Sequence, residues 1–263
     1  MKRKINFAAP LLSVLIFISC RSSPEDTLIT DSTTTIDSSA QIAVDSGNAS
    51  PGSEKIGTLP ADSSGLKIVP PAEPTPDLSQ IPDSSFVELI TLDPTLVLDM
   101  RYATPDNFLK EKVYDCDKCV LRKEAALALV KAQAVLRKQG YRLRLFDCYR
   151  PLDVQKKMWE IMPDDRFVGN PYSNGSMHNK GAAVDLTLAD STGRELDMGT
   201  PFDFFGREAY HAYTQLSPEI LSRRKLLKET MIQAGFSPIT SEWWHYSYKR
   251  KSYRLANFKP DCQ

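Results

Sequence analysis

The chain has 263 residues, of which 41% are hydrophobic and 25% are charged, and its 33 basic and 33 acidic side chains balance at neutral pH. This length is enough for one or two domains. The charge balance argues against a nucleic-acid-binding protein, which would be expected to show a basic stripe or a basic excess in one domain.

Residues 1–20 are typical of an export signal. A basic start at Lys2–Lys4 precedes an apolar run from Phe7 to Ile18, which is too short for a comfortable membrane span. The end of this segment resembles a bacterial lipoprotein cleavage box, in which Cys20 becomes the lipidated first residue. We therefore expect a lipoprotein of the cell envelope that faces the periplasm and touches the membrane through its lipid alone. An ordinary secretory signal with an accidental cysteine is the alternative.

Residues 21–80 are predicted to form a disordered tether. They contain 18 Ser or Thr, seven Pro and no aromatic residue, so they cannot bury enough apolar surface to offset their conformational entropy. The folded domain is then residues 81–263, which hold 27 basic and 24 acidic residues, a net charge of about +3.

Four cysteines remain in that domain: Cys116, Cys119, Cys148 and Cys262. An even set in an exported protein favours structural disulfides, and three pairings are open. Cys116 and Cys119 also have the spacing of half a zinc ribbon or of a redox motif, but no second pair of that kind is present.

The first half of the domain begins with two short strand candidates, residues 86–90 and 96–100, separated by Asp93-Pro94. Residues 121–139 show apolar side chains at helical spacing and end at a glycine, which predicts a core-packing helix. Alternating residues 141–145 predict a half-buried strand. It leads to Arg150, which is placed either for a pocket or for a surface ion pair.

The second half begins with a helix at residues 153–162, which Asp153 could cap, and a loop at 163–175. Residues 190–193 predict a hairpin turn, and residues 201–206 an aromatic loop whose single carboxylate, Asp203, is either solvent-facing or functional. A helix then starts at Ser217-Pro218 and ends at Gly235, with a buried face of Ile220, Leu227, Met231 and Ala234. Helices among alternating strands predict an α+β domain with a mainly antiparallel sheet.

One stretch, residues 176–185, pairs His178 with Asp185 across glycine and small residues, just before an apolar alternating run. A turn followed by a strand would bring this nitrogen and oxygen ligand together, which suits a divalent metal such as zinc. A histidine and an aspartate at this spacing also arise by chance, so the stretch needs a third ligand.

The missing groups stand together near the C-terminus. His245 would complete a two-histidine, one-aspartate ligand set that leaves a position for water. Glu242 is expected in the turn or bulge before that strand and could take a proton from the water. The alternative is that the neighbouring tryptophans bury a core strand in which His245 merely forms hydrogen bonds. His211 remains a competing ligand.

These motifs resemble the zinc D-alanyl-D-alanine dipeptidases, relatives of the D,D-carboxypeptidases and of the Hedgehog signalling domain. The likeness spans most of residues 86–258 and includes the segments 101–108, 147–151, 176–188, 198–199, 202–204 and 242–245. Several motifs in one order are more specific than any single motif. Cys148 departs from the pattern, since the family usually has glycine beside this arginine.

The resemblance implies one Zn²⁺ per chain. It implies that zinc is bound by His178, Asp185 and His245, with Glu242 as the general base. Arg150 would stabilise the oxyanion, Tyr102 and Asp203 would hold the free amino group of the substrate, and Ser176 its backbone. The expected substrate is D-alanyl-D-alanine or a related small peptide. The rivals are a D,D- or L,D-carboxypeptidase that trims peptidoglycan stem peptides and a non-catalytic wall-binding protein. The physiological role, the membrane and the oligomeric state stay open.

Overall fold

The computed structural model describes residues 77–248 and 252–262. The expected export signal with Cys20, and the tether up to residue 76, lie outside the described residues. Within the described part of the chain, no helix combines the length and apolar character that a membrane crossing needs. The first element is a short 3-10 helix, Leu78–Gln80.

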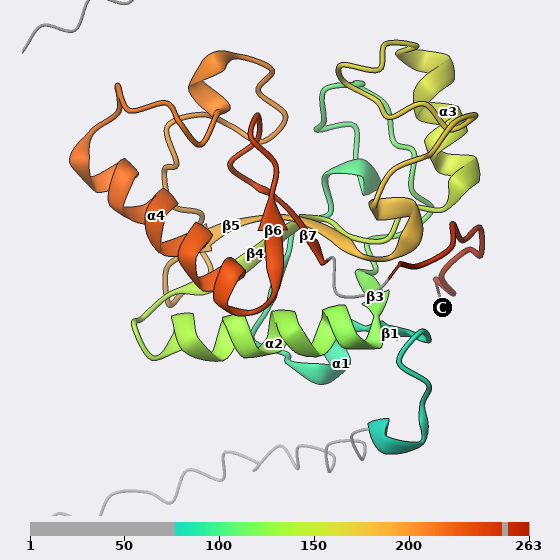
Figure 1. The fold of residues 1–263 in the computed structure, drawn as a ribbon, viewed down its shortest axis with the longest axis horizontal. Helices are drawn as coiled ribbons and strands as arrows, with labels where there is room; N and C mark the ends of the chain where they lie inside the picture. The colour runs from blue at the N-terminus through green and yellow to red at the C-terminus, as the bar shows by residue number, and fades with distance from the viewer. Residues whose placement is uncertain (1–76, 249–251, 263) are drawn as a thin grey trace, which may run out of the picture. The chain divides into compact units, whose positions relative to one another are not determined.

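A five-stranded sheet with the order β2-β4-β5-β7-β6 forms the centre of the domain (Figure 1). β2 and β4 run parallel, and the other neighbouring pairs are antiparallel. A two-stranded antiparallel sheet pairs β1 with β3. The strands are β1 (Phe86–Glu88), β2 (Val97–Leu98), β3 (Val120–Arg122), β4 (Arg142–Asp147), β5 (Ala183–Ala189), β6 (Phe236–Pro238) and β7 (His245–Tyr248).

The helices are α1 (Leu89–Leu92), α2 (Lys123–Arg137), α3 (Leu152–Ile161) and α4 (Pro218–Gln233). α2 runs along the sheet, while α3 and α4 lie at opposite sides of it (Figure 1). α4 begins where predicted, because the Ser217 hydroxyl accepts a hydrogen bond from the Ile220 amide and Pro218 occupies the first turn. The prediction of an α+β domain with a mainly antiparallel sheet is confirmed.

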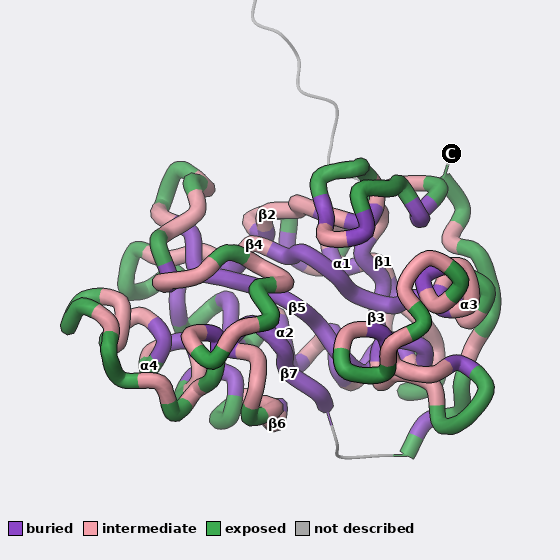
Figure 2. Tube along the Cα trace, turned by 90° about the horizontal axis from the view of Figure 1, so that it is seen from above, coloured by how far each residue is buried: buried purple, intermediate pink, exposed green. Residues whose placement is uncertain are grey.

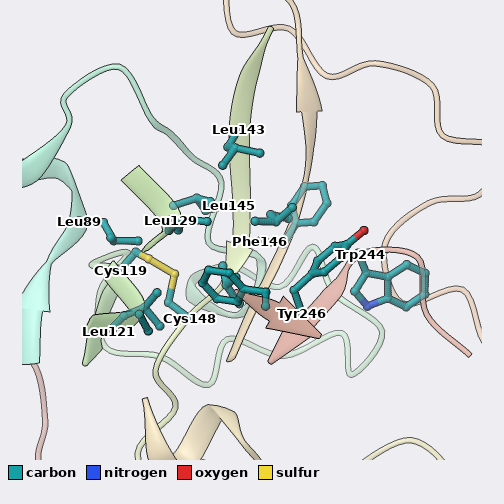
Figure 3. Packing of buried hydrophobic residues seen from close by; sticks show 14 of the residues in the cluster. Leu89, Cys119, Leu121, Leu129, Leu143, Leu145, Phe146, Cys148, Trp244 and Tyr246 are labelled. Atoms are coloured by element: carbon teal, nitrogen blue, oxygen red, sulfur yellow. A yellow bond between two sulfur atoms is a disulfide. The ribbon is translucent and has the colours of Figure 1, made fainter. Parts of the chain in front are cut away.

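Strand alternation gives the central sheet two chemically different faces. Leu145 of β4 lies opposite Leu186 of β5, and such leucines pack in the core with α2 (Figure 3). In β4 the register shifts between Leu145 and Asp147, which brings Asp147 opposite Asp185. Asp147, Asp185 and His245 therefore stand side by side on the other face, in three neighbouring strands. All three strands are deeply buried (Figure 2), so this row of polar side chains lies inside the protein.

Two predicted boundaries at the start of the domain were wrong. The strand predicted at residues 86–90 stops at Glu88, and the helical turn α1 follows it. The helix predicted from residue 121 begins at Lys123, because Leu121 belongs to β3, where it pairs with Val87. An apolar residue that fits the helical stripe also fits a buried strand.

Two details of the later helices were also wrong. Pro151, not Asp153, is the residue that precedes α3, and the Asp153 side chain instead accepts a hydrogen bond from Asn257. On α4, Ile220 and Ala234 were predicted to be buried but are half-buried, whereas Arg224 and Thr230 are buried. A helix that packs on loops as well as on a sheet buries polar side chains that can bond to loop backbone.

All four cysteines of the domain are in disulfides, as predicted, and the structure gives the pairing: Cys116 with Cys262 and Cys119 with Cys148. The second disulfide is buried in the core between β3 and the end of β4 (Figure 3). The first fastens the C-terminal tail. In this tail the Ala256 amide donates to the Asn179 carbonyl, and the Ala256 carbonyl accepts from the Leu152 amide.

Candidate metal centre and substrate cavity

Three potential metal ligands converge on the polar face of the sheet. Asp185 of β5 is the register partner of His245 of β7, and His178 belongs to a 3-10 helix, His178–Lys180, just before β5. The Asp185 carboxylate lies 2.9 Å from Nδ1 of His245 and 3.4 Å from Nε2 of His178. The two ring nitrogens are 3.2 Å apart.

The turn between His178 and β5 depends on Gly181. Its φ is +67°, in the left-handed region that glycine adopts without steric cost. A Cβ at this position would meet the ring of Phe86 at 2.2 Å, so the close approach also requires glycine. The predicted tight turn before the strand is thus confirmed, and it places His178 beside Asp185.

The outward nitrogens of both histidines are already occupied. Nδ1 of His178 lies 2.7 Å from the carbonyl oxygen of Cys148, and Nε2 of His245 lies 3.0 Å from the Ser247 hydroxyl. With a proton on each of these nitrogens, the opposite nitrogens keep a lone pair that points toward Asp185. The three ligand atoms lie within 4.8 Å of one another and are buried. The residues fit a small divalent metal, and nitrogen and carboxylate donors suit zinc.

Arg150 lies beside this cluster as a buried cation, not in a surface ion pair. It donates to the buried Asp147 carboxylate through Nη2 and to Gln155 at 2.9 Å through Nη1. Burial alone would lower the pKa of Arg150, but the adjacent Asp147 carboxylate, together with the Tyr114 and Tyr102 hydroxyls, holds this pKa well above its ordinary value. The remaining donor, Nε, has no partner among the described residues. The side chain of Arg150 as a whole lines the cavity described below.

A cavity of about 190 Å³ opens over the cluster. It has the volume of about six water molecules, which is enough for a small molecule. The structure brings all eight site residues predicted in the domain to its lining: Tyr102, Arg150, Ser176, His178, Asp185, Asp203, Glu242 and His245. Asp165, Arg166, Phe167, Gly169, Phe205 and Ile239 complete it.

Two further carboxyl groups line this cavity, Glu242 beside the converging ligands and Asp203 beside Tyr102, and we call these two groups of lining residues its two ends. Glu242 lies in the bend before β7, as predicted, and burial raises the pKa of its carboxyl above the ordinary value. At the other end, the Tyr102 hydroxyl donates to the Asp203 carboxylate at 2.9 Å. Burial raises the pKa of Asp203 well above its ordinary value, and the nearby Asp185 and Glu242 carboxylates add to this. Asp203 thus lines the cavity with Tyr102 and does not simply face solvent.

His211 does not join the cluster. Among the described residues, the group of potential metal ligands consists of His178, Asp185 and His245. His211 packs near Tyr246 instead, and burial lowers the pKa of its ring to about 4, so it is neutral at pH 7.

Some residues that position the site had received no role from the sequence. Asp147 holds Arg150 and also accepts a hydrogen bond from Tyr114. The amide of Asn179 donates to the Arg150 carbonyl at 2.9 Å, and its oxygen accepts from the Ser176 amide at 2.7 Å. In the sequence, the position of Asp147 at the end of a strand and three residues before Arg150 is a signal for the contact between these two side chains. Nothing in the sequence marks Tyr114.

Two histidines and one carboxylate that converge on one point, with a glutamate and an arginine in the same cavity, define a metal-dependent peptidase of the α+β class. The family model described as D-ala-D-ala dipeptidase matches residues 83–259. The chain belongs to this family of zinc metallopeptidases.

Two curated relatives agree with this assignment. A D-alanyl-D-alanine dipeptidase of Escherichia coli is 35% identical over 180 residues, which cover 68% of this chain and 93% of the relative. One of Enterococcus faecium is 32% identical, covering 61% of this chain and 89% of the relative. A solved vancomycin resistance D,D-pentapeptidase in complex with Zn(II) aligns at 17% identity, with a TM-score of 0.34, over 51% of this chain and 76% of its own.

Proposed function

We propose that this chain is a zinc-dependent dipeptidase that hydrolyses D-alanyl-D-alanine in cell-wall peptide metabolism. One observation carries the proposal: a single small cavity joins three converging metal ligands and Glu242 at one end to the Tyr102–Asp203 pair at the other. Membership of the D-ala-D-ala dipeptidase family supports the substrate class. The cavity is large enough for a small molecule such as a dipeptide.

His178, Asp185 and His245 would hold the zinc ion through two nitrogens and one carboxylate oxygen. Zinc in this ligand set supplies Lewis acidity, which lowers the pKa of water and polarises the carbonyl of the scissile bond. Cys148 and Ser247 fix the orientation of the two histidines from behind.

Glu242 serves as the general base and then as the general acid. Its carboxylate accepts a proton from the attacking water and passes this proton to the leaving amino group, because a raised pKa makes both transfers feasible near neutral pH. Arg150 faces the oxygen on which negative charge develops. Its guanidinium would donate there, while Asp147 and Gln155 hold it in place.

Recognition of the free amino group falls to Asp203 and Tyr102. The Asp203 carboxylate and the Tyr102 hydroxyl form a pair that an ammonium group of the substrate completes. A substrate without a free amino group leaves these buried groups unpaired, which costs binding energy. Ser176, which also lines the cavity, would contact the substrate backbone.

The test is hydrolysis of D-alanyl-D-alanine by the purified, metal-loaded chain, with zinc content measured in parallel. We expect about one zinc per chain, turnover that a chelator abolishes and zinc restores, and little turnover of the N-acetylated dipeptide. Zinc-free pure protein, or full activity of Glu242→Gln, would refute the proposal. Lys225→Gln on the exposed side of α4 is the matched control.

Two other functions give different results in the same assay. A carboxypeptidase that trims peptidoglycan stem peptides would prefer N-blocked or longer substrates over the free dipeptide. The Tyr102–Asp203 pair in the cavity argues against it. A wall-binding protein without activity would bind peptidoglycan and release no alanine, but Glu242 and Arg150 in the lining argue against that role.

We also propose that residues 1–20 direct export, that Cys20 carries the lipid anchor, and that the domain works in the periplasm at the end of a tether. The two disulfides support an oxidising compartment. Mass spectrometry of the mature N-terminus tests this proposal directly. A lipidated Cys20, and release of the Cys20→Ser variant from the membrane fraction, are the expected results, whereas an unmodified cysteine would overturn it.

A further inference from the structure

A buried arginine outside the cavity ties together both ends of the loop that carries Asp203. Arg224 projects from α4 and is 6% exposed. Its Nε donates to the carbonyl oxygen of Met198 at 2.7 Å, and its Nη1 donates to that of Glu208 at 2.8 Å. These two carbonyls flank residues 199–207, which we call the amine loop. One planar guanidinium therefore fixes the separation of the two ends of this loop.

No ion pair among the described residues accounts for the burial of this charge. No carboxylate of the described residues lies within ion-pair distance of Arg224, and the backbone carbonyls of Met198 and Glu208 are its acceptors. A buried cation without an adjacent counterion is costly unless it is hydrogen-bonded. Burial lowers the pKa of this guanidinium, and the Asp197 carboxylate, which lies beyond ion-pair distance, offsets part of this effect. The two carbonyl contacts are therefore what keeps Arg224 in place.

Arg224 also acts on the amine loop indirectly, through Trp243. The guanidinium lies over the ring of Trp243, 5.6 Å from its centroid. The indole nitrogen of Trp243 in turn donates to the Thr200 hydroxyl at 2.8 Å. Trp243 directly follows Glu242, so Arg224 and Trp243 connect the amine loop to the segment that bears the general base.

The middle of the amine loop needs this support. Asp203 has a φ of +58°, in the left-handed region that costs energy for a residue other than glycine. Such a conformation persists where the surrounding structure enforces it. The Tyr102 hydroxyl holds the Asp203 carboxylate, and Phe202 stacks on Phe146 with ring centroids 4.8 Å apart. These contacts hold the centre of the loop, while Arg224 holds its ends.

We propose that Arg224 is a positioning residue for substrate recognition: by bridging the Met198 and Glu208 carbonyls, it sets the strained loop that presents Asp203 to the amino group of the substrate. The proposal rests on the proposed dipeptidase function. It assigns to α4, a helix that contributes no residue to the cavity lining, control over affinity and selectivity for a free N-terminus. The proposal gives Arg224 no role in metal binding or in the chemical step.

The test compares Arg224→Gln and Arg224→Lys with the exposed control Lys225→Gln. We expect Arg224→Gln to raise KM for the free dipeptide about tenfold, since a lost bond to a charged group has this order of effect. We expect kcat to stay within about threefold and zinc content to stay unchanged. The N-acetylated dipeptide should be hydrolysed as before, so selectivity falls. Arg224→Lys should recover part of the loss, because its ammonium reaches one carbonyl and lacks the planar fork.

A double-mutant cycle with Asp203→Asn separates positioning from general destabilisation. In the Asp203→Asn background, Arg224→Gln should raise KM little further, because the group that it positions is already gone. Full additivity of the two effects would overturn the proposal. If Arg224→Gln does not fold, Thr200→Val provides the alternative, since it removes the Trp243 contact to the loop without burying or removing a charge.

Hydrogen exchange distinguishes failure of this proposal from failure of the proposed function. Amides of residues 199–207 should exchange faster in Arg224→Gln than in Lys225→Gln, while those of β5 and β7 should not change. Unchanged exchange in the loop of a folded Arg224 variant would refute the positioning role. An inactive wild-type protein with the expected exchange pattern would refute the dipeptidase assignment, but it would still support the role of Arg224 in positioning the amine loop.

Discussion

The two ends of the cavity are held by different parts of the fold. At the metal end, Asp185 and His245 sit in paired strands, and His178 is oriented by the carbonyl of Cys148, which a buried disulfide ties to Cys119. At the amine end, Asp203 lies on a loop with a strained backbone, held by side chains such as Tyr102. Backbone ladders and a covalent bond fix the first end; side-chain contacts fix the second.

This difference separates chemistry from recognition. Metal ligands and a general base need their geometry within fractions of an ångström, which strands provide better than loops. A recognition loop is free to differ in sequence without disturbing the sheet beneath it. We therefore expect changes at the metal end to abolish turnover, and changes at the amine end to alter substrate affinity and selectivity.

The largest expected effect follows removal of a ligand at the metal end. Asp185→Asn takes away the carboxylate that lies between the two histidine nitrogens. We expect loss of bound zinc and of detectable dipeptide hydrolysis, with the fold retained because an amide has nearly the same shape. Metal analysis and circular dichroism check this outcome. A variant that keeps stoichiometric zinc and activity would place the metal elsewhere.

Glu242→Gln should spare the metal and stop the chemistry. Its side chain lines the cavity without belonging to the converging ligand group. We expect kcat to fall by about 10²- to 10⁴-fold, the usual contribution of a general base, with KM and zinc content nearly unchanged. A rise in KM alone would move Glu242 from the metal end to the amine end.

Asp203→Asn tests the opposite half of the comparison. Loss of the charge that meets the substrate ammonium should raise KM by about 10- to 100-fold, because a hydrogen bond between charged groups contributes about 1.5–3 kcal/mol. The value of kcat should change much less, and the N-acetylated dipeptide should be unaffected. Steady-state kinetics on both substrates decides this. A collapse of kcat with KM unchanged would show that the two ends are not separable.

The two disulfides offer a further contrast. Replacing both Cys119 and Cys148 with serine loosens the segment whose carbonyl orients His178. We expect zinc affinity to fall by at least about tenfold, as for other groups that orient metal ligands. The matched control replaces Cys116 and Cys262, which fasten the C-terminal tail at the surface. It should lower the free energy of unfolding by about 2–5 kcal/mol and leave zinc affinity unchanged. Chelator competition and thermal unfolding measure both quantities.

The sequence predicted the metal end better than the amine end, for a physical reason. His178, Gly181 and Asp185 lie within eight positions of one another, so a turn and strand alternation suffice to bring them together. The tight turn at Gly181 and the bend at Glu242 were therefore predictable. Asp203, by contrast, had two open interpretations, because its environment depends on Tyr102, 101 positions away.

Long-range contacts also explain what the sequence missed. Arg224 falls on the helical stripe that predicted apolar residues, and the partners that stabilise its charge are backbone carbonyls of a distant loop. Every residue has a backbone carbonyl, so a sequence does not show which carbonyls will accept a hydrogen bond from a distant side chain. The disulfide pairing was open for the same reason, since three pairings satisfied every local pattern. The family resemblance supplied the roles of the cavity residues, but not the contacts that hold them.

The smallest expected effect tests whether α4 acts on the amine end through Arg224 alone. Ser217→Ala removes the side-chain cap of α4, in which the Ser217 hydroxyl accepts from the Ile220 amide at 3.3 Å. We expect the free energy of unfolding to fall by about 1 kcal/mol. KM should not change, because Arg224 lies two turns further along the helix and its bonds to Met198 and Glu208 remain. Thermal unfolding and steady-state kinetics of the same preparation measure both. If KM rises with this small loss of stability, general loosening of α4 is enough to displace Asp203, and the amine end is less firmly held than its two carbonyl bonds indicate.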